Sequence, residues 1–383
     1  MGEEPHEVLQ ALQDLHDAGT DIVTTDVNGQ YISTAGTSFS SPYVAAVGAL
    51  LLAHRPELTH VQVRAILENT TDPIYYGDPS NHIFLSGPNP IWQSAYASRI
   101  STRADWITSV VGQTVPEPSA AVLVGIGAAM IGLRPIIEMM TVNFSMLAMD
   151  QIVNHGAKLR YMSGGQLRIA AVIRAPQGAG LQLGAQHSQS LEAWYAHVPG
   201  LKVVCPGTPA DAKGLLKSSV RDGNLVMFLE NEMLYGSKGE VPDGEYTIPI
   251  GKADVKCPGA DVTIITYSRM LTLAMKAAEQ LIAEDIDAEV VDLMTIRPMD
   301  TETIVGSVKK THRAVIVEED WRSFGAGAEI AAVLQEQAFD YLDAPVVRIA
   351  SADVPMPYSK PLEQMALPQV DVIVDAVRQI MGA

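Results

Sequence analysis

Residues 262–293 read VTIITYSRMLTLAMKAAEQLIAEDIDAEVVDL. An apolar run at 262–267 is followed by a segment with helical spacing of its apolar residues, 271–283, and then by a second apolar run, 289–293. A strand buried on both faces is apolar throughout, whereas a helix on a sheet is apolar along one side. The stretch therefore predicts a strand, a helix and a second strand.

The same alternation extends outward over the chain from about residue 124 to its end. Further strands are expected at 169–173, 201–205, 225–229, 314–318 and 346–350, and further helices at 301–310 and 328–342. Strands this apolar, separated by helices of this length, are typical of parallel sheets covered on both faces. The predicted fold class is α/β.

The first 75 residues follow another pattern. β-branched residues on both sides of Asn28-Gly29 predict a β-hairpin. Helices are expected at 1–18, 43–54 and 60–69, the last with Thr59 as its N-cap. From 75 to 113, proline, glycine and serine replace any regular pattern, which indicates a linker. The expected division is a first domain 1–75, a linker 76–118, and two α/β domains, 119–245 and 250–383.

Composition narrows the class of protein. The chain has 383 residues, 47% of them hydrophobic, and a net charge of −18, which opposes general binding to nucleic acid or anionic lipid. Cys205 and Cys257 are too few for a disulfide framework and are expected to be structural. The start, MGEEPHEVLQ, lacks the pattern of a secretory signal, so a cytoplasmic location is expected.

Residues 119–133, SAAVLVGIGAAMIGL, are uncharged and follow the tetrapeptide VPEP. The segment resembles the sorting tail of bacterial exported proteins that carry a Pro-Glu-Pro motif. Its apolar run is about 15 residues, shorter than the ~20 that span a bilayer, and its glycines also suit a tightly packed helix. A helix packed in a soluble core is the favoured interpretation, and a membrane location is not expected.

The heptapeptide GTSFSSP, residues 36–42, matches the pattern Gly-Thr-Ser-x-x-x-Pro. With the apolar segment after it, residues 17–73 resemble the C-terminal part of a subtilisin-like serine protease, and Ser38 takes the place of the nucleophile. A serine needs a base and an orienting carboxylate. In that family both lie far upstream, in Asp-Thr-Gly and His-Gly-Thr motifs, and neither motif occurs in the 37 residues before Ser38. Ser38 is therefore predicted to be a relic at a helix start.

A second resemblance covers about 260 residues and rests on four stretches: GAAMIGLRPIIEMMTVNFSMLAMDQIVNHGAKLRYMSGG (127–165), LGAQHSQSLEAWYAHVPGLKVVCP (183–206), RPMDTETI (297–304) and SADVPMPYSK (351–360). They are similar to the beta subunit of the decarboxylating component of pyruvate dehydrogenase, a thiamine-diphosphate-dependent 2-oxoacid dehydrogenase. The resemblance implies a pyrimidine-binding domain, truncated here, and a transketolase-type C-terminal domain. It also implies a heterotetramer of two alpha and two beta chains.

The resemblance implies that thiamine diphosphate is shared with the alpha subunit. That subunit would supply the magnesium site, since this chain has no Gly-Asp-Gly motif. In the family, a glutamate nine positions before the GAAM segment activates the coenzyme. Here Pro118 holds that position and Glu117 is displaced by one, and proline fixes φ and lacks an N–H. Impaired activity is therefore expected.

The remaining site residues are also implied by the resemblance. Phe144 would pack against the aminopyrimidine, or be an ordinary core residue. His187, in AQHSQ, would act on substrate or in acyl transfer to lipoamide, or be structural. Asp343 would dock the dihydrolipoyl acyltransferase core, or be a solvated acid. A potassium site, or else a solvated turn, would be formed by Asp222 and Asn224 with carbonyls of Ala171, Ser219 and Val220.

The predicted function is that of an impaired beta-subunit-like chain, active in pyruvate oxidation only with an alpha subunit. Partners would be the alpha subunit, the acyltransferase core and a second beta chain. Two alternatives stay open: a non-catalytic assembly module of the complex, and a serine peptidase that uses Ser38.

Overall fold

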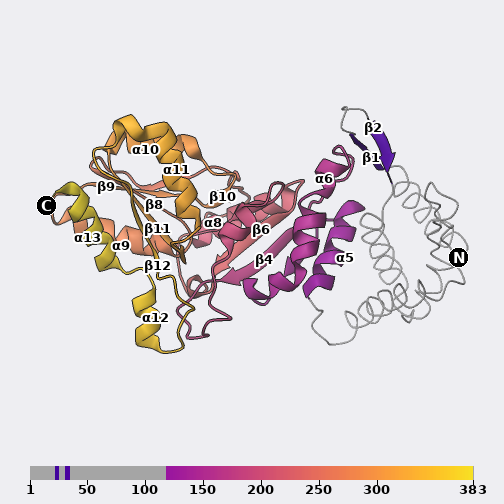
Figure 1. The fold of residues 1–383 in the computed structure, drawn as a ribbon, viewed down its shortest axis with the longest axis horizontal. Helices are drawn as coiled ribbons and strands as arrows, with labels where there is room; N and C mark the ends of the chain where they lie inside the picture. The colour runs from indigo at the N-terminus through magenta and orange to yellow at the C-terminus, as the bar shows by residue number, and fades with distance from the viewer. Residues whose placement is uncertain (1–21, 26–30, 35–117, 383) are drawn as a thin grey trace, which may run out of the picture. The chain divides into compact units, whose positions relative to one another are not determined.

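A computed structural model describes residues 22–25, 31–34 and 118–382 (Figure 1). The chain divides into two compact units, one of residues 1–135 with 147–170 and one of residues 136–146 with 171–383. The predicted helices at 1–18, 43–54 and 60–69, the linker, Ser38 and Glu117 lie outside the described residues.

The first unit holds the predicted hairpin strands and the apolar segment. β1 (Ile22–Thr25) pairs antiparallel with β2 (Tyr31–Thr34), which confirms the two strands expected beside Asn28-Gly29. α5 (Pro118–Met130) is buried along much of its length and contacts η2 (Gln151–Gly156), with α6 (Leu159–Met162) beyond. Among the described helices, none has the length and apolar character needed to cross a bilayer.

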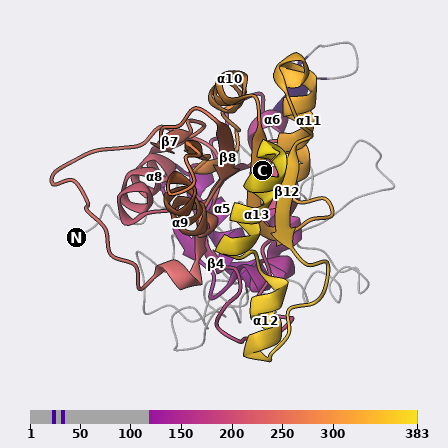
Figure 2. The same cartoon turned by 90° about the vertical axis from the view of Figure 1, so that its left-hand side faces the viewer.

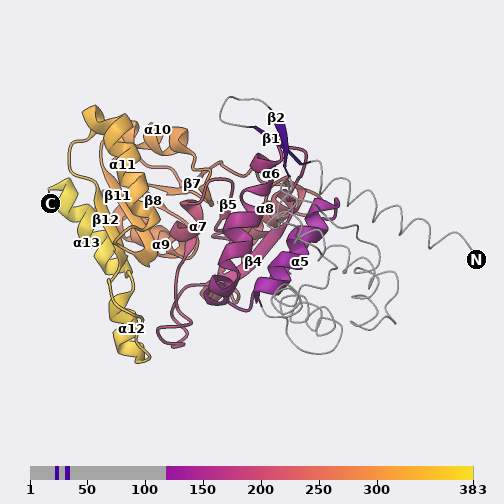
Figure 3. The same ribbon diagram turned by 45° about the vertical axis from the view of Figure 1, so that its right-hand side comes forward.

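The second unit contains two five-stranded sheets. The first has the order β10-β5-β6-β4-β3. Its strands are β3 (Ile136–Glu138), β4 (Val172–Gln177), β5 (Lys202–Val204), β6 (Val226–Asn231) and β10 (Thr295–Arg297). β3, β4, β6 and β5 are parallel, and β10 is antiparallel at the edge. β4 and β5 of this sheet are labelled in Figure 3. Around them lie η1 (Val142–Ala148), α7 (Glu192–Ala196), α8 (Pro209–Arg221) and η3 (Glu232–Leu234).

The second sheet has the order β12-β11-β8-β9-β7. Its strands are β7 (Asp254–Cys257), β8 (Val262–Thr266), β9 (Ala288–Asp292), β11 (Ala314–Trp321) and β12 (Val347–Ser351). Its helices are α9 (Met270–Ile282), α10 (Thr301–Thr311), α11 (Ala326–Ala338), η4 (Phe339–Tyr341), α12 (Lys360–Ala366) and α13 (Val370–Met381). β7 is antiparallel to β9, and the other strand pairs are parallel.

Helices cover both faces of this sheet (Figure 2). Successive residues of a strand such as β8 point to opposite faces of the sheet. Val262 and Ile264 belong to the core cluster that includes residues of α9 and α13. Thr263, between them, contacts Ser307 and Thr311 of α10 through their hydroxyl groups at 2.7 and 2.6 Å. The period of two thus confirms a strand buried on both sides, as its continuous apolar sequence predicts.

Several element bounds differ from the prediction. The strand expected at 169–173 begins only at Val172, because Ile169 and Ala170 are buried without joining the ladder. The helix expected at 328–342 ends at Ala338 and continues as the short η4. The edge strands β7 and β10 run antiparallel in otherwise parallel sheets, and neither strand was predicted.

Candidate functional site

The candidate site lies where β4 and β6 end, in the first sheet of the second unit. The carboxyl ends of parallel strands are the usual place for a site in an α/β sheet. β4 ends at Gln177 and leads into the loop 178–190, and β6 ends at Asn231 and leads into η3. His187 lies on the loop, half-buried, and its backbone N–H donates to the carbonyl of Gly184 at 3.3 Å.

The start and end of the loop 178–190 are joined by a hydrogen bond. The N–H of Gly178 donates to the carbonyl of Gln189 at 3.1 Å. Gly178 has φ +98°, a conformation that L side chains rarely adopt. A Cβ at this position would also lie 2.3 Å from Nδ2 of Asn231, so the loop can leave β4 in this direction only with glycine.

The structure brings Phe144 and His187 into contact, which the sequence analysis did not predict. Their ring centroids are 5.6 Å apart and the planes meet at 62°, an edge-to-face arrangement. Phe144 lies on η1, whose Asn143 accepts a hydrogen bond from Nε2 of Gln189 at 2.8 Å. The contact places the imidazole against an aromatic ring. The roles of both residues stay predictions.

Glu232, on η3, is a neighbour of His187 that the sequence analysis missed. Burial raises the pKa of the Glu232 carboxyl, and the nearby charge of His187 opposes that shift. The sequence position of Glu232, directly after a buried strand, could have indicated a site residue. Residues that follow parallel strands lie at the same edge of the sheet.

The residues predicted to hold potassium lie together at the opposite ends of β4 and β6. The N–H of Asp222 donates to the carbonyl of Ser219 at 3.2 Å, and the N–H of Asn224 donates to Oδ1 of Asp222 at 2.8 Å. The carbonyl of Ala171 accepts from the N–H of Val226 at 3.0 Å. These oxygens suit a hard cation.

The fit of a potassium ion is reduced by a charge that the sequence analysis did not consider. The Lys202 ammonium group forms an ion pair with the carboxylate of Asp222. A bound cation would therefore share that carboxylate with Lys202. The potassium site, including Val220, stays a prediction.

Asp343 lies at the surface after η4. Its side chain is 56% exposed and lies 3.6 Å from a guanidinium nitrogen of Arg313. Its backbone N–H donates to the carbonyl of His312 at 2.9 Å. Within this unit, the Asp343 side chain is accessible to a partner protein. Docking of an acyltransferase there stays a prediction.

A group of buried acids lies near the end of the loop and was not predicted. Glu192, 1% exposed, accepts hydrogen bonds from Nε2 of Gln177 at 2.7 Å and from the hydroxyl of Tyr267 at 2.8 Å. Burial raises the pKa of Glu192. Burial, with the charge of Glu192, raises the pKa of Asp320 to about 9.

Asp292, at the end of β9, gives a prediction for stability against pH. Burial raises its pKa to about 8, with a further contribution from Asp211. Its folded-state pKa lies above the unfolded value, so its contribution to stability is present in acid and is lost as pH rises toward 8. Asn in its place keeps the oxygen that accepts from the N–H of Met294 at 3.1 Å.

Asp292→Asn is therefore expected to gain stability over the parent as pH rises. The difference in free energy of unfolding should grow by about 2 kcal/mol or more between pH 5 and pH 8. Urea denaturation of both chains at each pH measures it. A difference that is constant across this range would contradict the prediction.

Comparison with known proteins gives three matches to protein-family models. Residues 117–238 match the family model "Transketolase, pyrimidine binding domain", residues 251–373 match "Transketolase, C-terminal domain", and residues 15–99 match "Subtilase family". A solved structure, a split gene transketolase in an inactive beta4 tetramer, has a TM-score of 0.59 at 21% identity. It covers 90% of this chain and 97% of its own, and at this identity it shows the fold alone.

The relatives of this chain include proteins named pyruvate dehydrogenase E1 component subunit beta. The protein of Rhizobium meliloti is 55% identical over 258 residues, which are 67% of this chain and 56% of the relative. The mitochondrial beta-2 protein of Oryza sativa is 46% identical over 343 residues, 88% of this chain and 91% of the relative. The Dictyostelium discoideum protein is 54% identical over 261 residues, with 67% and 73% covered. The chain therefore belongs to the family of pyruvate dehydrogenase E1 component beta subunits, and it carries a subtilase-family segment fused before the family's domains.

Proposed function

We propose that this chain supplies the pyrimidine-side half of a thiamine diphosphate site to an alpha subunit, and that its activity is impaired. The reaction would be oxidative decarboxylation of pyruvate with acyl transfer to lipoamide. The observation that supports this most strongly is the contact of Phe144 with His187, two site residues that the same resemblance implies. Similarity to a beta subunit over 258 residues supports the same reaction.

Each of the two residues has a definite task in this proposal. When bound, the coenzyme supplies the carbon nucleophile and holds the electrons left after carbon dioxide departs. Phe144 offers a flat apolar surface for the aminopyrimidine ring and supports the imidazole edge-to-face. His187, half-buried beside Glu232, can hold or move a proton at a substrate oxygen, because imidazole serves as either acid or base.

The expected impairment comes from the start of α5. The position that the family fills with the activating glutamate is Pro118, the first residue of α5. Proline is well suited to the first turn of a helix and has no ionisable group. Placement errors of about 1 Å already cost roughly 100-fold in rate, so a carboxylate one residue away cannot simply replace the missing one.

The remaining parts of the assembly belong to the same proposal. The alpha subunit would supply the magnesium and diphosphate site. Asp343 would contribute to docking of the dihydrolipoyl acyltransferase core, and two beta chains would meet in the tetramer. Potassium would bind beside the ion pair of Asp222 with Lys202.

Co-expression with the alpha subunit of a close relative tests the proposal. We expect the chain to co-purify with alpha, and pyruvate oxidation with an artificial electron acceptor to be at least ~100-fold slower than with a complete beta subunit. Turnover equal to that of the complete subunit would contradict the impairment. Failure to co-purify would contradict the partner.

The two alternatives give different outcomes in related assays. A purely structural module predicts the same residual turnover for His187→Ala and the parent, whereas our proposal predicts a further loss. A serine peptidase predicts labelling of Ser38 by a fluorophosphonate probe, which disappears in Ser38→Ala. We expect no labelling of Ser38, because a serine without its base is a weak nucleophile.

A further inference from the structure

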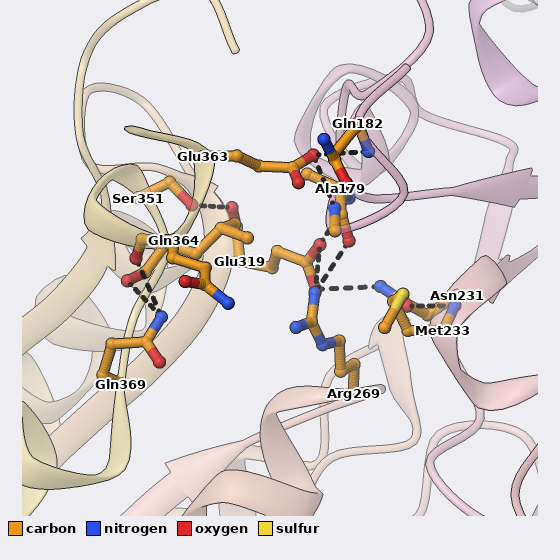
Figure 4. A network of polar contacts seen from close by, with 12 residues as sticks. Ala179, Gln182, Asn231, Met233, Arg269, Glu319, Ser351, Glu363, Gln364 and Gln369 are labelled. Carbon is orange, nitrogen blue, oxygen red and sulfur yellow. Dashed lines mark hydrogen bonds and ion pairs between the residues drawn. The ribbon is translucent and has the colours of Figure 1, made fainter. Parts of the chain in front are cut away.

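The loop that carries His187 is held at its start by two carboxylates from the second sheet and its helices (Figure 4). Oε1 of Glu319, on β11, accepts from the N–H of Ala179 at 2.7 Å. Oε1 of Glu363, on α12, accepts from the N–H of Gly180 at 2.9 Å and from that of Gln182 at 3.1 Å. Three backbone donors of one short segment thus end on two acids more than 130 residues away in sequence.

The backbone conformation of this segment explains why it needs anionic acceptors. Gly178, Gly180 and Gln182 have φ of +98°, +115° and +59°, whereas the residues between them have negative φ. Such alternation turns neighbouring N–H groups toward one side and forms a concave anion-binding nest. Here the anions are side chains of the same polypeptide. Without them, these donors would be left without acceptors.

Both acids are buried and already committed to this arrangement. Glu363 is 1% exposed and Glu319 is 8% exposed. The second oxygen of Glu319 accepts from Nδ2 of Asn231 at 2.8 Å. Arg269 links the same parts, since its guanidinium donates to the carbonyl of Ala179 at 2.7 Å and lies 3.5 Å from Glu319.

Close packing extends the anchor toward His187. A Cβ on Gly184 would lie 2.3 Å from the ring of Tyr358, so this ring lies directly against the loop backbone. Tyr358 shortly precedes α12, which carries Glu363. The carbonyl of Gly184 in turn accepts from the N–H of His187. The loop near the histidine is therefore packed against Tyr358 and hydrogen-bonded to Glu363.

We propose that Glu319 and Glu363 are positioning residues for His187: the C-terminal α/β domain holds the histidine loop through a carboxylate-filled nest. This inference rests on the proposed function insofar as His187 acts on substrate. The loop's geometry itself does not depend on that role. The domain that contributes no residue to the Phe144–His187 contact thus determines where the histidine lies.

Removal of one carboxylate in the full-length chain tests the proposal. Glu363→Ala leaves two N–H groups without their acceptor, so amide exchange at Gly180 and Gln182 should accelerate roughly tenfold or more. Carbethoxylation of His187 by diethyl pyrocarbonate, followed by mass spectrometry, should accelerate several-fold. His312, exposed and remote in sequence, serves as the internal reference and should react at the parent rate.

Two further variants keep the test decisive. Glu319→Gln retains the shape of the side chain but only one acceptor oxygen for the donors of Ala179 and Asn231, and a smaller acceleration at His187 is expected. Glu279→Ala, at an exposed position on α9, should change neither rate. If Glu363→Ala also accelerates the carbethoxylation of His312, the variant has loosened the chain as a whole. The rate at His187 in Glu319→Gln then tests the proposal.

Unchanged exchange and unchanged modification of His187 in both Glu319→Gln and Glu363→Ala would overturn the inference. Neither measurement requires an alpha subunit, thiamine diphosphate or turnover. A chain that fails to bind alpha would therefore refute the proposed function and leave this test standing. A chain that binds alpha but shows no loosening would refute the anchor alone.

Discussion

Arg348→Ala is expected to lower the free energy of unfolding by about 3–5 kcal/mol, because it leaves a buried carboxylate without its counter-charge. Glu318, on β11, is 0% exposed, and its Oε1 lies 2.8 Å from a guanidinium nitrogen of Arg348 on β12. Its other oxygen accepts from the N–H of Gly327 at 2.6 Å. One neutral donor cannot replace a charged partner in this interior.

The loss should depend on pH in a definite direction. Burial raises the pKa of Glu318, and Arg348 opposes that shift. Removing Arg348 therefore raises this pKa further, and stability is lost as pH rises through it. The loss in free energy of unfolding caused by Arg348→Ala should be largest in alkaline buffer. It should become smaller in acid, where Glu318 binds a proton. Urea denaturation at several pH values measures it.

Arg378→Ala is the matched control in the same domain. Arg378 also forms ion pairs, with Glu284 at 2.6 Å and Asp375 at 2.7 Å, but it is 43% exposed. Exposed pairs contribute about 0–1 kcal/mol. A double change, Glu318→Gln with Arg348→Ala, should recover part of the loss. Equal losses for Arg348→Ala and Arg378→Ala would contradict the account.

The second sheet could be predicted from sequence because its central strands are uniformly apolar. Val262–Thr266 and Ala288–Asp292 were expected within a residue of their bounds, and the intervening helix likewise. The edge strand Asp254–Cys257 was missed because it has charged residues and is largely exposed. A strand buried on both faces has a continuous apolar sequence that can be recognised. An edge strand is partly exposed and lacks this pattern.

Resemblance pointed to Phe144 and to His187 as site residues, whose roles stay predictions, but no local pattern could predict the residues that hold the histidine loop. Glu319 and Glu363 reach the histidine loop across 140 and 183 positions of sequence. Only the packing of the two sheets in one unit makes those contacts. The pairing of Lys202 with Asp222 was missed for a similar reason, since parallel register places β5 beside β6.

We propose that residues 118–382 retain a competent half-site and lack the activating acid. A chimera tests this proposal: the segment before Ser119 is replaced by the corresponding part of the Rhizobium meliloti beta subunit, through the position of Pro118, where the resemblance places the activating glutamate. This change restores both the missing carboxylate and the missing start of the pyrimidine-binding domain. Glutamine in place of that glutamate provides the control, because it keeps the restored chain and removes the acid.

Pyruvate oxidation by the chimera and by the parent chain, each assembled with the same alpha subunit, is the measurement. We predict that the chimera turns over at least ~100-fold faster than the parent, and that the glutamine control stays close to the parent. A parent chain that already matches the chimera would contradict the claim, as would a chimera that binds alpha but remains as slow as the parent.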